Sequence, residues 1–320
     1  MKAIYYEQHG NADVLQYGEL PTPDPDSDQV LVKIAVAAVN PIDRRLRSGE
    51  LQAYISRTFP VVPGWDFSGT IVKIGSNVTN WKVGDEVVGL AFTWSIQHGT
   101  YAEYCPVDAS AIALKPPGLS FVDAASLPLV SLTAWQALDE FAGLKRGQTV
   151  LIQAGAGGVG SVAIPIAKHL GAKVYTTTRS ENFNYVMDRG ADHPIDYTTH
   201  DYVEVIKEME PDGLDVVLES LYGDKIVEDA IHLTKNGGAV PYLNNEPPEL
   251  ADIASRSIKT EFIHHRPDGE MLAMLVSLFA SGDLLAPRVT TMNLSEARKA
   301  HEQSERMTTN GKLVLQVGGI

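Results

Sequence analysis

The sequence predicts an α/β protein in which a barrel-like β domain is joined to a doubly wound parallel sheet. Three observations support this fold class. Short β-branched runs, punctuated by glycine and proline, occupy roughly the first 120 residues. Strand-like and helix-like segments then alternate along the chain. A glycine cluster at 155–160 stands between the first strand of that alternating region and the helix after it.

The N-terminal segment contains four candidate strands. The longest is Gln29–Val39, a run rich in β-branched residues. The shorter ones are Asp66–Ile74, Glu86–Gly89 and Thr100–Val107, each bounded by turn residues. Strands of this length and spacing are typical of antiparallel barrels.

The pattern changes near Ser120, and apolar residues recur at helical spacing from Phe121 to Ala142. Beyond that point strands and helices alternate, as in a doubly wound sheet. The strands are expected at 149–154, 173–178, 215–219, 239–243 and 259–264, and the helices at 159–170, 181–189 and 224–233. Two helical patterns, 269–281 and 295–307, precede a last strand at 312–317.

Composition limits the classes of function. The 320 residues include 40 Asp and Glu against 26 Lys and Arg, a net charge of −14. An acidic chain without a Lys/Arg block suits phosphate backbones poorly, so nucleic-acid binding is not expected. Cys105 is the only cysteine, which excludes an intrachain disulfide and a four-cysteine zinc site. With no signal-peptide pattern and no membrane span, the expected compartment is the cytoplasm.

Residues 155–160, Gly-Ala-Gly-Gly-Val-Gly, fit the dinucleotide-binding pattern G-x-G-x-x-G between a strand and a helix. Gly155 would allow the tight turn, Gly157 would let the backbone approach a pyrophosphate, and Gly160 would let the helix pack closely. With Gly158 and Val159, these residues would place phosphates at the helix N-terminus, where the dipole favours negative charge. The alternative is a glycine-rich turn that binds no ligand.

The second strand of the expected sheet ends without the acidic residue that binds an NAD ribose. Arg179 follows it instead and could clamp a 2′-phosphate, with the hydroxyls of Thr178 and Ser180 as further donors. The sequence therefore predicts NADPH rather than NADH as cofactor. The alternative is that Arg179 is a solvated residue beside a site that accepts either cofactor.

Several further short motifs combine glycine, proline and acidic residues. They are Met1-Lys2-Ala3, Val39-Asn40-Pro41-Ile42-Asp43, Pro63-Gly64-Trp65-Asp66-Phe67-Ser68-Gly69, Gly84-Asp85-Glu86-Val87, Leu132-Thr133-Ala134-Trp135 and Asn310-Gly311-Lys312-Leu313-Val314. Together with the glycine cluster they resemble the medium-chain dehydrogenase/reductase superfamily from end to end. The resemblance implies a GroES-like barrel domain formed by residues 1–121 and 266–320, with a Rossmann domain, residues 122–265, inserted between them. It also implies a homodimer.

The chain departs from the zinc alcohol dehydrogenases of that superfamily at the metal site. They carry cysteine, histidine and cysteine ligands where this chain has Asn40, Trp65 and Leu129, whereas Asp66 keeps an acid at its position. These side chains cannot build a zinc site, so no metal is expected. The chain is most similar to the zinc-independent quinone oxidoreductase (zeta-crystallin-like) and alkenal/enone reductase branch. That resemblance implies hydride transfer from NADPH to a quinone or an α,β-unsaturated carbonyl.

The same resemblance implies roles for residues outside the glycine cluster. Tyr197 would lie beside the adenosine phosphate, or else serve as a core or edge aromatic. Leu221 and Tyr242, at the ends of two strands, would line the nicotinamide. Thr133 would lie beneath that ring, and Lys312 would close over the cofactor.

The substrate pocket is expected around Asn40, Trp65, Asp66 and Leu129. Asn40 could donate a hydrogen bond to a carbonyl oxygen, or it could hold the cleft together. The structural role is favoured for Asp66, because buried acids usually serve partner hydrogen bonds. No catalytic acid or base stands out, and Tyr54 and Tyr242 are the candidate proton donors, although both could be pocket walls.

Two alternatives to quinone or enone reduction stay open. The first is a 2-enoyl-thioester reductase, a branch that shares the Asn-Pro-x-Asp stretch and uses a tyrosine proton donor from the N-terminal domain, for which Tyr54 is the test residue. The second is an NADPH-binding sensor or structural protein with little turnover. The absence of a strong catalytic acid or base favours it.

Overall fold

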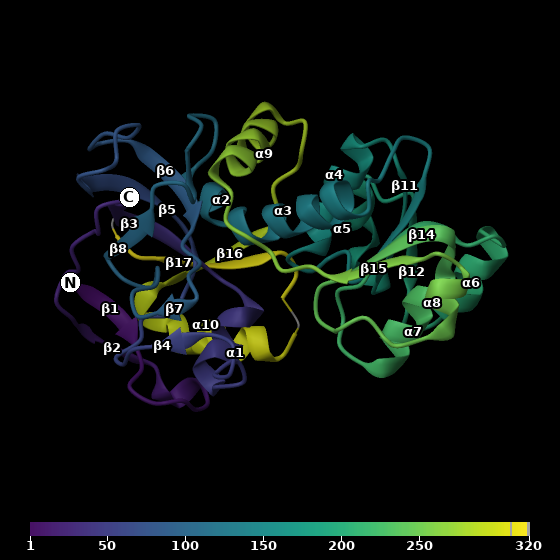
Figure 1. Cartoon of the computed structure of the whole chain (residues 1–320), viewed down its shortest axis with the longest axis horizontal. Helices are drawn as coiled ribbons and strands as arrows, with labels where there is room; N and C mark the ends of the chain where they lie inside the picture. Colours follow the sequence, from purple (N-terminus) through teal and green to yellow (C-terminus); the bar gives the residue numbers. More distant parts are fainter. Residues whose placement is uncertain (308, 319–320) are drawn as a thin grey trace. The chain divides into compact units, whose positions relative to one another are not determined.

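The computed structural model describes residues 1–307 and 309–318 (Figure 1). Contacts divide the chain into two units. The first unit comprises Met1–Leu129, Arg266–Gly282 and Ala286–Ile320, and the second comprises Val130–His265 and Asp283–Leu285. The superfamily resemblance predicts the first boundary after residue 121, and the contacts place it after residue 129. The predicted fold class, a GroES-like β domain with a doubly wound parallel sheet, is confirmed.

A seven-stranded sheet forms the first unit. Its strands are, in order, β16 (Val289–Asn293), β17 (Lys312–Gln316), β3 (Gln29–Val39), β5 (Asp66–Ile74), β6 (Glu86–Leu90) and β9 (Ile112–Leu114), with β8 (Tyr104–Asp108) also paired to β3. Only β16 and β17 pair in parallel, and the other pairings are antiparallel. The pairing of β3 with β5 shifts register at two points, and such bulges bend a strand as a barrel requires.

Strand β8 begins later than the sequence suggests. Thr100 and Tyr101 do not join the sheet as the first residues of that strand. Their N–H groups donate to the carbonyls of Gly64 and Pro63, at 3.0 Å each. This turn buries the Tyr101 ring completely. The apolar and β-branched residues of 100–103 thus serve a buried turn, which the pattern alone does not distinguish from a strand.

The remaining elements of the first unit are short. Two small pairings join β1 (Lys2–Tyr5) to β2 (Gln16–Glu19) and β4 (Ser56–Arg57) to β7 (Ser95–Ile96). The helices are α1 (Pro41–Ser48), α2 (Phe121–Ala125), α9 (Gly269–Ser281) and α10 (Ala297–Glu305). Helix α1, absent from the sequence-based expectations, begins at Asn40 with a capping box closed by Asp43 and has a proline in its first turn.

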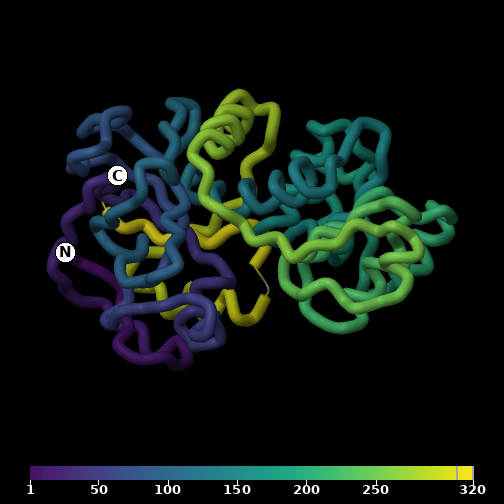
Figure 2. Tube along the Cα trace, viewed as in Figure 1, coloured from purple at the N-terminus to yellow at the C-terminus, as the bar shows by residue number. Residues whose placement is uncertain are grey.

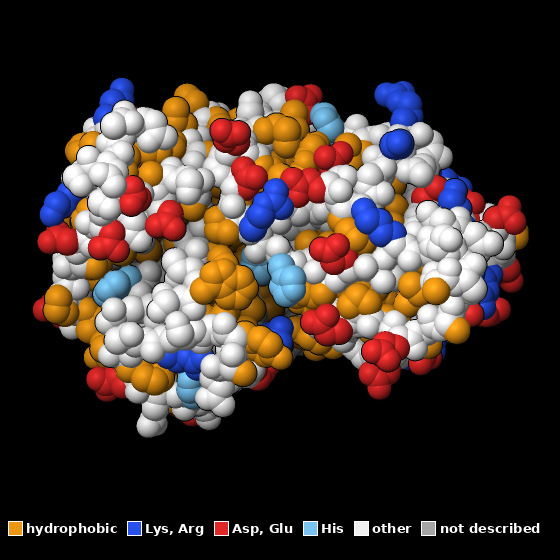
Figure 3. All heavy atoms as spheres, in the orientation of Figure 1, with side chains coloured by type: hydrophobic (Ala, Val, Ile, Leu, Met, Phe, Trp, Pro, Cys, Tyr) orange, Lys and Arg blue, Asp and Glu red, His pale blue; other side chains and the backbone are white. Residues whose placement is uncertain are grey.

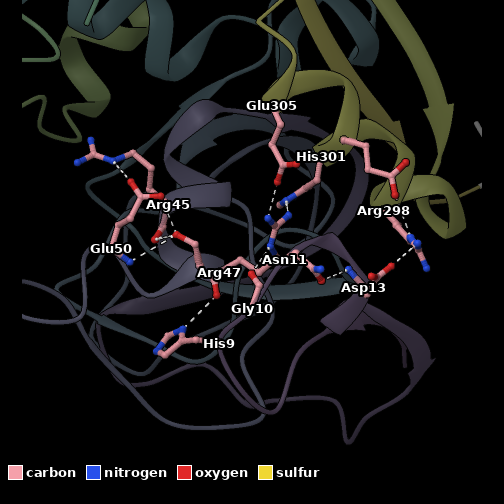
Figure 4. A network of polar contacts seen from close by, with 12 residues as sticks. His9, Gly10, Asn11, Asp13, Arg45, Arg47, Glu50, Arg298, His301 and Glu305 are labelled. Carbon is pink, nitrogen blue, oxygen red and sulfur yellow. Dashed lines mark hydrogen bonds and ion pairs between the residues drawn. The ribbon is translucent and has the colours of Figure 1, made fainter. Parts of the chain in front are cut away.

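Arg47 of α1 joins three segments that are far apart in the sequence (Figure 4). Its guanidinium donates to the carbonyl of Gly10 at 3.1 Å and to Nδ1 of His301 at 2.9 Å, and it pairs with Glu305 at 2.5 Å. His301 and Glu305 belong to α10. These contacts hold the C-terminal helix to the N-terminal segment, and Figure 2 shows both ends of the chain in this unit.

The second unit contains a six-stranded parallel sheet. Its strand order is β12 (His193–Asp196), β11 (Lys173–Thr178), β10 (Thr149–Ile152), β13 (Leu214–Leu218), β14 (Thr234–Tyr242) and β15 (Lys259–Phe262). All of these pairings are parallel. The chain starts in the middle at β10, moves outward to β12 and then returns to β13 on the other side of β10. This reversal defines a doubly wound sheet and places its switch point between β10 and β13.

Helices cover both faces of this sheet. They are α4 (Gly160–His169), α5 (Phe183–Asp188), α6 (Tyr202–Met209), α7 (Asp224–Leu233) and α8 (Ala251–Ser255). Helices α4 and α5 lie on one face, and α7 and α8 lie on the other (Figure 1). The single helical stretch expected from Phe121 to Ala142 is divided into α2, α3 (Pro128–Trp135) and a π-helical turn, Gln136–Phe141. Pro128 explains the division, because proline disfavours helix at the residue before it.

The surface carries scattered charge. On the face drawn in Figure 3, lysines and arginines stand singly or in small groups among acidic and uncharged side chains. Among the described residues, no helix is both long and apolar enough to cross a bilayer.

Candidate functional site

The glycine turn of the second unit connects β10 to α4. A Cβ on Gly155 would lie 2.0 Å from Oγ1 of Thr176, and a Cβ on Gly160 would lie 2.3 Å from the carbonyl oxygen of Ala154. The turn therefore packs directly against β11, and the first residue of α4 packs against the turn. Gly157 has more room, since its nearest neighbour would be the Ala154 oxygen at 3.2 Å.

This arrangement suits a pyrophosphate. The N–H groups of Ser161 and Ala163, in the first turn of α4, donate to the carbonyls of Gly157 and Val159 at 3.0 and 2.8 Å, so an anion would be bound by the N–H groups just before them. The open backbone at Gly157, with Gly158 and Val159 after it, lies at the same end of the sheet strand. Gly155 and Gly160, where a Cβ would clash with neighbouring atoms, allow that end of the helix to lie close to the sheet. The donor set thus fits an anionic, phosphate-containing cofactor.

The predicted adenosine-end residues meet at the ends of β11 and β12. Arg179 Nε donates to the hydroxyl of Tyr197 at 3.3 Å, and the exposed Tyr197 ring leaves this pair open to solvent. Ser180 N donates to Oδ2 of Asp196 at 2.9 Å, and Thr178 lies beside Asp196 in the strand pairing. The structure therefore brings Thr178, Arg179, Ser180 and Tyr197 to one corner of the sheet.

Asp196 was not expected in this corner. The NAD-binding pattern predicts an acid at the end of β11, whereas Asp196 ends the neighbouring strand. Its carboxylate also accepts from Thr198, at 2.9 Å from N and 2.6 Å from Oγ1. These hydrogen bonds lower the pKa of Asp196 and keep it ionised. Its oxygens are thus occupied in shaping the loop.

Two residues expected beside the nicotinamide differ in their surroundings. Thr133, on α3, is buried, and its hydroxyl has no hydrogen-bond partner among the described residues. Such an orphaned group fits a site that a cofactor completes. Leu221 follows β13 and is half-buried, with its N–H donating to Oε1 of Glu219 at 2.9 Å.

The surroundings of Tyr242 differ from those expected. Its side chain is fully buried in the core between the sheet and α7, and its hydroxyl donates to the carbonyl of Val227 at 3.1 Å. The alternation of side chains along β14 turns this residue toward the helices. Burial raises the pKa of this phenol above the ordinary range. The expectations that the Tyr242 side chain lines the nicotinamide or donates a proton are therefore wrong.

The predicted pocket residues of the first unit surround a lysine. Lys312 Nζ donates to Oδ1 of Asn40 and lies 3.2 Å from Oδ2 of Asp66. Asn40 Nδ2 donates to the same Asp66 oxygen at 2.9 Å, and Leu129 N donates to Oδ1 of Asp66 at 2.8 Å. All four residues are buried. This contact between Lys312 and the pocket residues was not predicted from the sequence.

Sheet register explains the cluster. Strand β3 runs antiparallel to both β5 and β17, so its carboxyl end meets the first residues of both neighbours. Ala38 pairs with Asp66, and Val39 pairs with Leu313. Asn40 follows directly, which places it between the starts of β5 and β17.

A second acid lies next to this cluster. Oδ2 of Asp43 accepts from Asn40 N at 2.8 Å and from the Tyr101 hydroxyl at 3.0 Å. Burial raises the pKa of Asp43 to about 7. Burial also raises the pKa of Asp66, although the Lys312 ammonium and the hydrogen bonds from Asn40 and Leu129 oppose it.

Trp65 and Tyr54, the other candidates of the first unit, differ in their exposure. Trp65 is buried and packs edge-on against Phe92, with ring centroids 4.8 Å apart. Tyr54 is 76% exposed on the loop between α1 and β4.

The donor set does not fit a zinc ion. Trp65 and Leu129 offer no side-chain ligand, and an ammonium group already occupies the oxygens of Asn40 and Asp66. Within the described residues, no three His, Cys, Asp or Glu side chains are grouped to hold a metal.

Family models match both parts of the chain. Residues 26–117 match the alcohol dehydrogenase GroES-like domain, and residues 189–315 match the model described as zinc-binding dehydrogenase. The chain belongs to the medium-chain dehydrogenase/reductase superfamily. The match described as zinc-binding dehydrogenase covers residues 189–315 and so includes none of Asn40, Trp65 and Leu129.

Similar members of this superfamily are named as reductases. A 2-methylene-furan-3-one reductase of Solanum lycopersicum is 38% identical over 88% of this chain and 70% of its own length. A chloroplastic NADPH-dependent alkenal/one oxidoreductase of Arabidopsis thaliana is 39% identical over 75% of this chain and 61% of its own length. Escherichia coli quinone oxidoreductase, solved with NADPH, is 28% identical with a TM-score of 0.88, covering 99% of this chain and 100% of that one. The present chain is accordingly an oxidoreductase.

Proposed function

We propose that this protein is an NADPH-dependent reductase that transfers hydride to a quinone or an α,β-unsaturated carbonyl without a catalytic metal. The single observation that carries the proposal is the glycine turn at the switch point of the sheet, with Arg179 and Tyr197 at the corner beside it. The names of similar proteins support the same cofactor and acceptor classes. The donor set around Lys312 supports the absence of zinc.

The second unit would hold the cofactor by its two charged parts. The N–H groups around Gly157, Gly158 and Val159 would bind the pyrophosphate. Arg179 would bind the 2′-phosphate, with the Tyr197 hydroxyl holding the guanidinium in place. The Thr133 hydroxyl would donate to the nicotinamide. When bound, NADPH supplies the hydride.

The first unit would bind the acceptor through Asn40. Lys312 holds the amide oxygen of Asn40, and Asp66 accepts one of its amide hydrogens. The second amide hydrogen is thereby held in one direction and would donate to the carbonyl oxygen of the acceptor. A preorganised donor stabilises the negative charge that develops on that oxygen during hydride transfer. Enones and quinones are already electrophilic, so positioning and one such donor can replace a Lewis acid.

The test is oxidation of NADPH, followed by absorbance, with ortho-quinones, para-quinones and short alkenals in the presence of a chelator and with NADH in parallel. Turnover with NADPH that the chelator does not affect is the expected result. Turnover that the chelator abolishes contradicts the metal-free reaction, and equal use of NADH contradicts the role of Arg179.

Two other outcomes would change the assignment. Activity confined to enoyl thioesters and lost in Tyr54→Phe would support a 2-enoyl-thioester reductase. Tight NADPH binding without turnover of any acceptor would support a sensor or structural role.

We also propose that the protein forms a homodimer, as the superfamily resemblance implies. Light scattering at micromolar concentration tests this directly, and a monomer mass would contradict it.

A further inference from the structure

Glu219 is a buried acid that binds only hydrogen-bond donors from two strand ends. It follows β13, and its side chain is fully buried. Oε1 accepts from Leu221 N at 2.9 Å and from Asn245 Nδ2 at 2.8 Å. Oε2 accepts from Leu243 N at 3.0 Å and from Asn244 N at 3.1 Å. One carboxylate thus connects the segment after β13 to the segment after β14.

The same segment is held from its other side. Ser220 Oγ donates to the carbonyl of Gln153 at 2.8 Å, and Ser220 N donates to Oε1 of Gln153 at 3.3 Å. Gln153 directly follows β10 and precedes the glycine turn. Asn245 Nδ2 also donates to the carbonyl of Leu221 at 2.7 Å. The carboxyl ends of β10, β13 and β14 therefore form one connected polar network with Glu219 near its middle.

The position of this network relative to the cofactor follows from strand order. In a doubly wound sheet the dinucleotide lies across the carboxyl ends of the strands, with its pyrophosphate at the first glycine turn. Arg179 and Tyr197 mark the β11–β12 side as the adenosine end. The nicotinamide half must then lie on the opposite side of the switch point, over β13 and β14.

We propose that Glu219 is a positioning residue for the nicotinamide half of the cofactor, because it sets the spacing between the segments that follow β13 and β14. This inference rests on the proposed use of NADPH. Glu219 acts through Leu221, Leu243 and Asn245, and it is not assigned a contact with the cofactor or a step in the chemistry.

Asp196 is the matching residue at the adenosine end. It too is a buried carboxylate at the carboxyl end of a sheet strand, β12, and it holds Ser180 N and Thr198 at the corner that contains Arg179. The two acids lie at the ends of strands on opposite sides of β10. A substitution of one acid should therefore affect the binding of one half of the cofactor more than that of the other.

The isosteric variant Glu219→Gln tests the proposal. It replaces one carboxylate oxygen by an NH₂ group, which is a hydrogen-bond donor. That group would face other donors, either the N–H of Leu221 or the N–H groups of Leu243 and Asn244, and the hydrogen bonds there would be lost. Asn245→Ala is the second variant. It removes the hydrogen bonds from Asn245 to Glu219 and to the carbonyl of Leu221, and it leaves no cavity in the sheet because Asn245 is only partly buried. Asp196→Asn is the matched control. Thermal melting of each variant establishes that it is folded.

The readouts separate the two halves of the cofactor. They are the Kd of NADPH, the Kd of adenosine 2′,5′-bisphosphate, which represents the adenosine half, and the single-turnover rate of hydride transfer to a simple para-quinone at saturating NADPH. For Glu219→Gln and Asn245→Ala we expect weaker NADPH binding by about tenfold and slower hydride transfer. Adenosine 2′,5′-bisphosphate should bind as it does to the wild type. For Asp196→Asn we expect both ligands, NADPH and adenosine 2′,5′-bisphosphate, to bind more weakly.

Equal weakening of both ligands in Glu219→Gln would overturn the inference, because a general loss of structure affects both halves alike. Unchanged NADPH binding and hydride transfer in Glu219→Gln or, if that variant does not fold, in Asn245→Ala would overturn it as well. A wild-type protein that binds no NADPH would overturn the proposed function and this inference with it, whereas the first two results leave the proposed function standing.

Discussion

The ammonium group of Lys312 lies 3.2 Å from Oδ2 of Asp66, although the two residues are 246 positions apart in the sequence, and both side chains are buried. The pair joins the first residue of β17 to the first residue of β5. Asn40 accepts a hydrogen bond from the Lys312 ammonium and donates one to the Asp66 carboxylate, which also accepts from Leu129 N. Several testable consequences concern this cluster and the cofactor site.

The buried pair should make Lys312 important for stability. Lys312→Met leaves the Asp66 carboxylate without its cation in a closed site, and breaking a buried pair in this way costs about 3–5 kcal/mol. Urea unfolding at neutral pH measures the loss. Lys2→Met is the control, because the Lys2–Glu19 pair is exposed and its loss should not be measurable. Equal effects of the two substitutions would contradict this account.

Asp43 should make stability depend on pH. Its pKa is raised to about 7 by burial, whereas an unfolded Asp ionises near pH 4. Between about pH 4 and pH 7 the folded protein binds more protons than the unfolded chain, so this contribution to stability is lost as pH rises, at up to about 1.4 kcal/mol per pH unit. The variant Asp43→Asn keeps an oxygen for Asn40 N and Tyr101 but cannot ionise.

Asp43→Asn should therefore gain stability relative to the wild type as the pH rises from about 4 to about 7. Urea unfolding at several pH values measures this difference. The comparison must be made as a difference, because His301 acts in the opposite direction. Burial and then Arg47 lower the pKa of His301 to about 3, so its contribution is present above about pH 6.5 and is lost as pH falls. A constant difference between Asp43→Asn and the wild type would refute the prediction.

Arg179 should decide between NADPH and NADH. Replacing it by Gln removes the charge-assisted bonds to a 2′-phosphate, which corresponds to a rise of about 10- to 100-fold in the KM for NADPH. The KM for NADH should stay the same, because that cofactor lacks the phosphate. Tyr197→Phe should have a smaller effect in the same direction, since the Tyr197 hydroxyl only orients the guanidinium. Steady-state kinetics with both cofactors checks both variants.

The glycines of the turn should separate folding from binding. Gly160→Ala forces a Cβ to 2.3 Å from the Ala154 oxygen, so the helix start must move, and we expect a loss of about 1–3 kcal/mol. Gly157→Ala meets its nearest atom at 3.2 Å and should fold normally. Its methyl group would stand where the backbone approaches the pyrophosphate, so NADPH binding should weaken. Thermal melting and cofactor titration of both variants test this contrast, and normal NADPH binding by Gly157→Ala would place the pyrophosphate elsewhere.

Much of the fold is predictable because its elements are specified by neighbouring residues. The predicted bounds of β3, β5 and β11 agree with the structure, since β-branched runs favour strands wherever the chain places them. Helix α9 also begins and ends as predicted. Asp268 caps its first turn by accepting from Met271 N, and Gly282 ends it in the left-handed conformation. The glycine turn belongs to this class, because strand, turn and helix are contiguous.

Other features depend on which segments meet. Residues 193–196 include a proline and one buried isoleucine, a pattern that does not predict a strand. They nevertheless form β12, because β11 pairs with them. The orientation of Tyr242 depends on its position in β14, where alternation turns the ring toward α7. Glu219 carries no local signal, because its donors come from two strand ends that only the sheet brings together.

Lys312 shows the same division most clearly. Its short motif, Asn-Gly-Lys-Leu-Val, predicts a final strand and supports the superfamily resemblance, and residues 312–316 do form β17. The partners of the ammonium group come from the pairing of β17 with β3 and of β3 with β5, which joins segments almost at opposite ends of the chain. Local propensities act over a few residues, whereas register between distant strands is decided by packing of the whole sheet. The strand could therefore be predicted from its own residues, and the buried ion pair could not.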